Sequence, residues 1–286
     1  MQCSAGRHGA ERARRRFGAA RRLGAWRHAG PFGRAVALLL LTAVAGCSLD
    51  APANPPPRTT IVIGVDVSGS FRSTGHYDDA LSFTARYIYG HMNGLGGLEV
   101  PRALFVGAIG GEEPGEPQAF HPIHDFRGHS VAEIEKDLRE WFQPDDRFTD
   151  FNAFFRRAAT LVKRQNLTLA PITLVVLSDG VPDLTARGAG RRTQVDDPAR
   201  YEGIELGDLE YLARNVTVRL LYPDPPVAVA WERHVPRGRV RLWTVDHVVM
   251  AGWHEQMLPD SAVEAQDALW KWVRDNVDFR VRRSLF

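Results

Sequence analysis

The stretch that decides the fold is residues 60–70, TIVIGVDVSGS. Its first part, Thr60–Val67, is a continuous run of β-branched and apolar residues, the pattern of a strand buried on both faces of a parallel sheet. The run ends in polar residues at alternate positions, Asp66, Ser68 and Ser70, so a loop can aim all three side-chain oxygens at one point. Because ligands bind beyond the carboxyl ends of the strands in such sheets, this segment predicts both a sheet and a polar site at its edge.

Further apolar runs have the length and composition of strands, and segments with helical spacing lie between them. The expected strands are Ala103–Ile109, Ile172–Leu177, Val216–Tyr222 and Arg239–Val245, with a short edge strand within Gln118–Phe126 after the loop Gly110–Pro117. The expected helices are Tyr77–Met92, Ser130–Phe142, Asp150–Gln165, Leu206–Arg214 and Ser261–Val277. This alternation predicts an α/β fold with a Rossmann-like, doubly wound, mostly parallel central sheet flanked by helices, spanning residues 60–286.

Residues 1–46 are interpreted as an export leader rather than as part of the fold. Nine arginines and one acid precede the apolar run Ala35–Ala45, which is too short to span a bilayer. The run leads into Val44-Ala45-Gly46-Cys47, which resembles the lipobox of bacterial lipoproteins and implies cleavage before Cys47 and a lipid on Cys47. The alternatives are an ordinary signal peptide and a buried helix with a chance cysteine. A start codon placed too early accounts for the length of the basic stretch.

Residues 47–59 would then form the lipidated cysteine and a Pro-rich tether that holds the domain off a membrane. The same resemblance implies a bacterial cell-envelope protein, and Ser48, where an aspartate would favour inner-membrane retention, favours the outer membrane. The leader holds nine of the 36 basic residues and one of the 34 acidic ones, so the remainder has 27 basic and 33 acidic residues, a net charge of −6. An acidic chain whose arginine-rich loop Thr185–Arg200 has no interleaved aromatic residue does not indicate nucleic-acid binding.

Polar residues that follow two of the expected strands point to a metal site. The expected strand Ile172–Leu177 ends in Ser178-Asp179-Gly180, which places a second carboxylate at the same edge of the sheet as Asp66. Thr149 lies at the start of an expected helix that can approach this edge. Two carboxylates and several hydroxyls form a hard oxygen set with no thiolate or imidazole, and such a set suits Mg²⁺, Mn²⁺ or Ca²⁺ rather than zinc.

These residues resemble the metal-ion-dependent adhesion site of the von Willebrand factor A domain family. In that family an Asp-x-Ser-x-Ser motif follows the first strand, a threonine lies on a later loop, and an aspartate lies in a strand-end Asp-Gly pair. Asp66, Ser68 and Ser70 match the first part. Thr149 matches the second, although the glycine that often precedes it is missing, and Asp179 matches the third.

The resemblance implies that these five residues hold a divalent cation, Mg²⁺ first and Mn²⁺ or Ca²⁺ as alternatives. It also implies that the open coordination position takes a carboxylate from a protein partner, as in an adhesion or assembly module. Asp150 and Asp183 lie close by in sequence and can support the ligands from behind. An N-cap role for Asp150 and a turn role for Asp183 are equally open.

Other functions are also compatible with an aspartate after the first strand. A metal-dependent phosphohydrolase would use Asp66 as a nucleophile, but such enzymes usually carry a second aspartate where Ser68 stands here. Ser68 does not lie in a Gly-x-Ser-x-Gly elbow, so a serine hydrolase is not indicated and no catalytic residue is expected. Two further alternatives remain. The metal could be purely structural in a scaffold protein, or the fold could have kept these loops and lost its metal.

Overall fold

The computed structural model describes residues 57–110, 119–144, 148–182 and 197–279, all of which belong to one compact unit, Pro56–Phe286. The predicted leader, Cys47 and Asp183 lie outside the described residues. Within the ranges described, none of the helices has both the length and the apolarity needed to cross a bilayer.

Six strands form a single sheet in the order β3-β2-β1-β4-β5-β6. The strands are β1 (Thr60–Asp66), β2 (Ala103–Ile109), β3 (Phe120–Pro122), β4 (Ile172–Leu177), β5 (Val216–Leu221) and β6 (Arg241–Val245). All neighbours pair in parallel except β3, which runs antiparallel to β2. The chain builds outward from β1 in one direction and then from β4 in the other, which is the strand order of a doubly wound sheet with its switch point between β1 and β4. The predicted fold class is confirmed.

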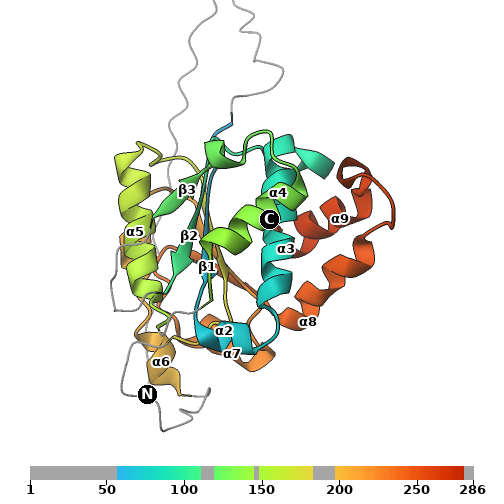
Figure 1. Cartoon of the computed structure of the whole chain (residues 1–286). Coiled ribbons are helices and arrows are strands. Elements are labelled where there is room, and N and C mark those ends of the chain that lie inside the picture. Colours follow the sequence, from blue (N-terminus) through green and yellow to red (C-terminus); the bar gives the residue numbers. More distant parts are fainter. Residues whose placement is uncertain (1–56, 111–118, 145–147, 183–196, 280–286) are drawn as a thin grey trace, which may run out of the picture. The chain divides into compact units, whose positions relative to one another are not determined.

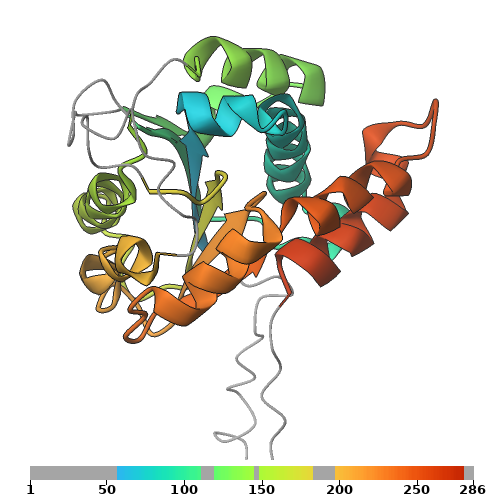
Figure 2. The ribbon, with the colours of Figure 1, turned by 90° about the horizontal axis from the view of Figure 1, so that it is seen from below.

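Helices cover both faces of the sheet (Figure 1, Figure 2). One face packs against α3 (Tyr77–Asn93), α4 (Val131–Trp141), α8 (His247–Met250) and α9 (Asp267–Trp272), and the other against α5 (Phe151–Arg164), α6 (Pro198–Glu202) and α7 (Pro225–His234). Ile61, Ile63 and Val65 of β1 enter the first core and Val62 enters the second, as strand alternation requires. Gly64 lies on the second face, where a Cβ would meet the Phe154 ring at 2.6 Å, so its missing side chain lets α5 approach the sheet.

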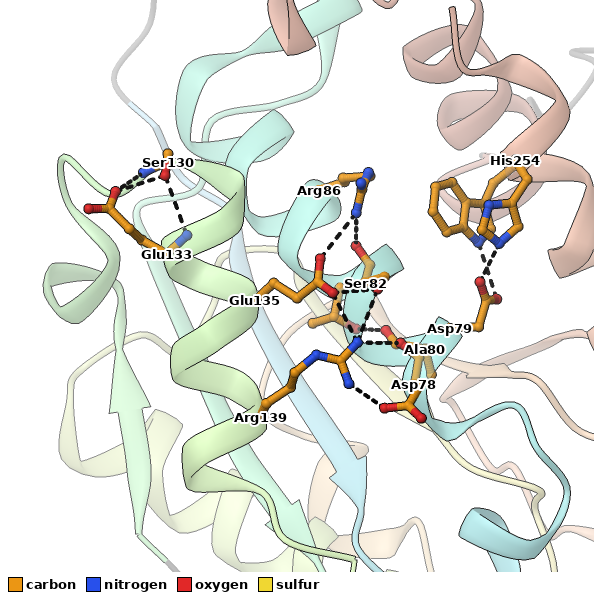
Figure 3. A network of polar contacts seen from close by, with 12 residues as sticks. Asp78, Asp79, Ala80, Ser82, Arg86, Ser130, Glu133, Glu135, Arg139 and His254 are labelled. Atoms are coloured by element: carbon orange, nitrogen blue, oxygen red, sulfur yellow. Dashed lines mark hydrogen bonds and ion pairs between the residues drawn. The ribbon is translucent and has the colours of Figure 1, made fainter. Parts of the chain in front are cut away.

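A polar network joins α3 to α4 on the solvent side (Figure 3). Arg139 of α4 forms ion pairs with Glu135, four residues earlier, and with Asp78 at the start of α3. Ser82 donates a hydrogen bond to the same Glu135 at 2.7 Å, and Arg86 lies 3.5 Å from it. These contacts orient α4 on α3. Because the side chains are partly exposed, the buried apolar residues between the helices contribute most of the stability.

Two of the predicted helices are wrong in extent. The segment Leu206–Arg214 forms only a 3-10 turn at Gly207–Leu209, because glycine weakens the helix and the backbone closes i,i+3 bonds such as Leu209 N to Leu206 O at 3.0 Å. The segment Ser261–Val277 is broken into a 3-10 turn at Val263–Ala265, helix α9 and a π-helix at Val273–Val277.

The side chain of Gln266 gives the reason for this break. It is buried and binds both the N–H and the carbonyl of Leu258, at 2.7 and 2.9 Å, which holds the preceding residues in a turn. The predicted edge strand within Gln118–Phe126 is shorter than expected: β3 has three residues, and a 3-10 turn at Ile123–Phe126 follows it.

Candidate metal centre

The first part of the site is the turn from β1 into the short helix α2 (Gly69–Ser73), at the end of the sheet viewed in Figure 2. Asp66 ends β1 and is fully buried. The backbone N–H of Ser68 donates to Asp66 Oδ1 at 2.9 Å, and Ser68 Oγ lies 3.0 Å from Ser70 Oγ. Ser68 also caps α2 by accepting from Phe71 N at 3.4 Å. The tight turn therefore gathers the three predicted oxygen donors of this loop.

The second part lies at the end of the neighbouring strand β4. Ser178 Oγ donates to Asp66 Oδ2 at 2.5 Å and accepts from Gly180 N at 2.9 Å. Asp179 is 8% exposed, and its Oδ1 accepts from Val181 N at 2.9 Å. The end of β4 thus anchors one carboxylate through Ser178 and turns the other toward the end of β1.

Gly180 and Trp231 hold this second turn. Gly180 has φ +75°, in the left-handed region, and a Cβ there would come within 2.9 Å of Leu220 and Val227. Its carbonyl accepts a hydrogen bond from Trp231 Nε1 of α7 at 2.6 Å, and both groups are buried. The position of the Asp179 loop therefore depends on α7 as well as on β4.

Both carboxylates have raised pKa values. Burial, and then repulsion by Asp179, raises the pKa of Asp66 to about 7, although hydrogen bonds from Ser178 and Ser68 oppose the shift. Burial also raises the pKa of Asp179, against hydrogen bonds from Val181 N and Ser70. Arg200 attracts Asp179 and partly opposes the rise of its pKa, whereas the described groups that lower the pKa of Asp66 are neutral hydrogen-bond donors. The pair is a concentration of buried negative charge that favours a bound cation.

Thr149 supplies a further donor from the loop before α5. It is 1% exposed, and its Oγ1 has no hydrogen-bond partner. Ser68 and Thr149 are the two described residues in an isolated β-bridge, which indicates that their backbones run beside each other. A buried hydroxyl without a partner is costly, and a metal ion at the neighbouring carboxylates would satisfy it.

Asp150, the remaining predicted site residue among those described, is an N-cap. Its Oδ1 accepts from Ala153 N at 2.8 Å and so caps the N-terminus of α5, the role that was open beside support of the ligands. Asp150 fixes the end of the helix that follows Thr149. Asp183 falls outside the described residues.

Sequence reasoning missed Asp224 as a neighbour of the site. Asp224 follows the end of β5 and occupies the N-cap position of α7 without a side-chain capping bond, and its charge further raises the pKa of Asp179. His247 of α8 lies 3.2 Å from Asp224 and stacks on His76 with ring centroids 4.6 Å apart. The strand-end argument that identified Asp66 and Asp179 could have been extended to Asp224, because all three follow parallel strands.

The donor set is made of two carboxylates and hydroxyls rather than of a cluster of acids or histidines. Among the described residues there is no group of three or more His, Cys, Asp or Glu that could hold a metal. A metal at this edge would therefore depend on Ser68, Ser70 and Thr149 as much as on the two carboxylates. Oxygen donors of this kind suit a hard divalent cation.

No family model and no curated protein matches this chain. Proximal thread matrix protein 1 of the mussel byssus is 13% identical over 77% of this chain and 48% of that chain, with a TM-score of 0.41. The pilus adhesin SpaC of Lactobacillus rhamnosus GG is 14% identical over 78% of this chain and 31% of that chain, with a TM-score of 0.42. The VWA domain of SpRpn10 is 11% identical over 66% and 88%, with a TM-score of 0.37.

These similarities are distant. The chain spans less than half the length of the mussel protein and of the adhesin. One structure of the mussel protein has a zinc-occupied MIDAS motif, which is a property of that protein. Identities and scores this low carry no argument about function, so the fold class rests on the strand order and the candidate site rests on its own geometry.

Proposed function

We propose that this chain is a divalent-cation-binding module of the von Willebrand factor A type, which uses the ion to bridge to an acidic group of a protein partner. The observation that carries the proposal is the pair Asp66 and Asp179: two buried carboxylates with raised pKa values, side by side at the switch point of the sheet. Ligands of doubly wound sheets bind at this point. A divalent cation would offset the repulsion by Asp179 that adds to the raised pKa of Asp66.

The residues present fit such an ion. Asp66, Ser68, Ser70, Thr149 and Asp179 would hold it directly or through water, and the orphaned Thr149 hydroxyl would gain a partner. All five offer oxygen, and Mg²⁺ is the first choice, with Mn²⁺ or Ca²⁺ as alternatives. When bound, the ion would supply a positive centre, and neutral hydroxyls or water would fill the coordination positions that the two carboxylates leave, so an outside carboxylate could replace one of them.

The partner is inferred from this charge and from the access to it. Ser70 is exposed while the carboxylates lie beneath it, so a group from outside can approach from the side of α2. A carboxylate of a partner protein would complete the coordination, and this would make the domain an adhesion or assembly module. The predicted lipid on Cys47 would hold the module in a bacterial envelope.

A thermal unfolding series tests the metal. Mg²⁺ at about 100-fold its Kd should stabilise the wild type by about 2.7 kcal/mol, and Asp66→Ala should abolish the response. Asp246→Ala is the matched control, because Asp246 also follows a strand and caps a helix, α8, at some cost in stability. An unchanged melting temperature of the wild type with Mg²⁺, Mn²⁺ and Ca²⁺ would contradict the proposal.

Partner capture tests the bridging role separately. Envelope extract should yield a partner with Mg²⁺ but not with EDTA, and Ser68→Ala or Thr149→Ala should lose it while remaining folded. Metal-dependent turnover of a generic phosphoester that Asp66→Asn abolishes would instead establish the phosphohydrolase alternative. Fatty-acid labelling that persists in Cys47→Ala would refute the lipid anchor without touching the metal site.

A further inference from the structure

A groove on the outer side of α5 is independent of the candidate metal centre. It encloses about 470 Å³ between α5 and the edge strand β3, which lie on the same side of β2 in Figure 1. Its lining shares no residue with the metal site and consists of Phe120, Ala153, Arg156, Arg157, Thr160, Leu161, Arg164 and Gln165. Phe120 is fixed in place by its contact with Phe154, with ring centroids 6.0 Å apart.

The helix that forms this groove is strongly basic in an otherwise acidic domain. α5 carries Arg156, Arg157, Lys163 and Arg164 and no acidic residue. Arg157 is held against the sheet by a hydrogen bond from its Nη2 to the carbonyl of Ala108 at 2.8 Å. Arg156 and Arg164 are exposed and form no ion pair with a described residue. Two guanidinium groups therefore stand at the groove with their charges available to a ligand.

The spacing of these two arginines sets the size of the ligand. Arg156, Thr160 and Arg164 follow each other at intervals of four and so form one row along α5. Eight residues of helix separate the two Cα atoms by about 12 Å, a spacing that suits two anionic groups held apart better than one carboxylate or one phosphate. An extended peptide covers about 13 Å in four residues, and its side chains at i, i+2 and i+4 share one face.

The floor of the groove beside this row is apolar. Phe120 and Leu161 are half-buried and belong to the rim of the second core, and Ala153 is buried beneath them. A peptide with acidic side chains at i and i+4 would therefore present its i+2 side chain to this floor. Thr160 Oγ1 donates to the Arg156 carbonyl at 2.8 Å, so it can only accept from the peptide's N–H groups, while the Gln165 amide can donate to the peptide's carbonyl groups.

We infer that this groove binds an extended acidic segment of a partner protein with the pattern Glu-x-apolar-x-Glu. The two glutamates pair with Arg156 and Arg164, and the central apolar side chain lies on Phe120 and Leu161. Charge complementarity selects the partner, and the spacing of the arginines selects the pattern. Binding here does not require a metal ion and is therefore independent of the function proposed above.

Fluorescence anisotropy with the full chain tests this inference. The probe is a labelled peptide Ser-Glu-Ser-Val-Ser-Glu-Ser, measured with EDTA present so that the metal centre does not contribute. Its isomer with adjacent glutamates, Ser-Glu-Glu-Ser-Val-Ser-Ser, is the matched probe. The first peptide should bind at least fivefold more tightly, and its affinity should fall as ionic strength rises.

Variants of α5 locate the site. Arg156→Gln and Arg164→Gln should each weaken binding about tenfold, since each removes a charged hydrogen-bond donor. Lys163→Gln is the control, because Lys163 is exposed on the same helix but does not line the groove, and it should change the affinity less than twofold. All three positions are exposed, so circular dichroism should show folded protein.

Several outcomes would overturn the inference. Equal affinity for the two peptides would show that the spacing of the glutamates does not matter. An equal loss of affinity in Lys163→Gln would indicate diffuse attraction to a basic helix. Competition by inorganic phosphate at the peptide's own concentration would indicate a site for single anions, and binding to phosphatidylglycerol vesicles without peptide binding would indicate a membrane surface. If the peptide binds only after Glu112, Glu113 and Glu116 are changed to Gln, the chain's own acidic segment is the occupant and not a partner.

Discussion

Asp66 and Asp278 lie at opposite edges of the same sheet and have opposite electrostatic surroundings. Asp66 ends β1 at the carboxyl edge, while Asp278 lines a cavity of about 290 Å³ with Thr59 and Thr173 at the amino edge. Both carboxylates are largely enclosed: Asp66 is 0% exposed, and the side chain of Asp278 is 20% exposed. Burial by itself raises the pKa of both.

Their neighbours differ. Asp278 Oδ2 lies 2.8 Å from His91 Nε2, and its Oδ1 accepts from Tyr87 OH at 2.8 Å. Burial opposes its charge, but attraction to His91 and hydrogen bonding outweigh burial and lower the pKa of Asp278. Asp66 has hydrogen-bond donors but faces a second carboxylate, Asp179, and so its pKa rises.

A buried carboxylate therefore serves two different purposes in one molecule. At the amino edge it is paired within the chain and joins α3 to the residues after α9, so its role is stability. At the carboxyl edge Asp66 faces Asp179 and forms no ion pair with a described cation, so its charge costs stability. The second arrangement is what distinguishes a binding site from a structural ion pair.

The largest expected effect is an opposite response of the two aspartates to the same change. In metal-free buffer, Asp278→Asn should lower the free energy of unfolding by about 3 kcal/mol, because it breaks a buried ion pair. Asp66→Asn should raise it, by on the order of 1 kcal/mol, because it removes a repelled charge while keeping an acceptor for Ser68 N. Urea denaturation with EDTA measures both. A loss of stability in both variants would mean that Asp66 is paired by groups other than those described.

The sequence was sufficient to predict the carboxyl edge because its signals are local. The run 60–67 identifies β1, and Asp66, Ser68 and Ser70 lie at alternate positions at its end, so strand alternation and the turn predict their convergence. Asp179 follows a second strand of the same kind. The parallel register of β1 and β4 then brings the two strand ends together.

The amino edge could not be predicted in the same way. His91 and Asp278 are 187 residues apart, and neither belongs to a motif with recognisable spacing. Their pairing depends on how α9 and the π-helix after it pack on α3, in a segment where the predicted continuous helix is wrong. The hydrogen bond from Trp231 to Gly180 was also unpredictable, since it depends on α7, a helix that hydrophobic spacing did not reveal.

The pH dependence of stability should reflect the pair at the amino edge. Burial lowers the pKa of His91, but the charge and hydrogen bond of Asp278 outweigh it, and the net pKa is raised above 6.5. A raised histidine pKa contributes stability that is fully present below about 6.5 and is lost as the pH rises through the folded-state value. The lowered pKa of Asp278 contributes stability above about 3.9 that is lost as the pH falls below it.

The pair should therefore stabilise the fold most between about pH 4 and 6.5. Urea midpoints across the pH range, compared between the wild type and His91→Gln, isolate this contribution, since the glutamine does not titrate. The difference between the two proteins should shrink above neutral pH. A difference that grows as the pH rises would mean that His91 is neutral in the folded state.

The smallest effect concerns how α7 holds the carboxyl edge. Trp231→Phe keeps the edge-on contact with Phe151, whose ring centroid is 5.1 Å away, but removes the hydrogen bond to the Gly180 carbonyl. The expected loss in the free energy of unfolding is about 1 kcal/mol, together with a weaker stabilisation by Mg²⁺, because the Asp179 loop loses its fixed position.

Trp270→Phe is the matched control: Trp270 Nε1 donates to Val263 O at 3.1 Å, away from the candidate metal centre. Both variants should lose similar stability, but only Trp231→Phe should lose part of the Mg²⁺ response. An equal Mg²⁺ response in the two would show that the Gly180 bond stabilises the fold without positioning the site.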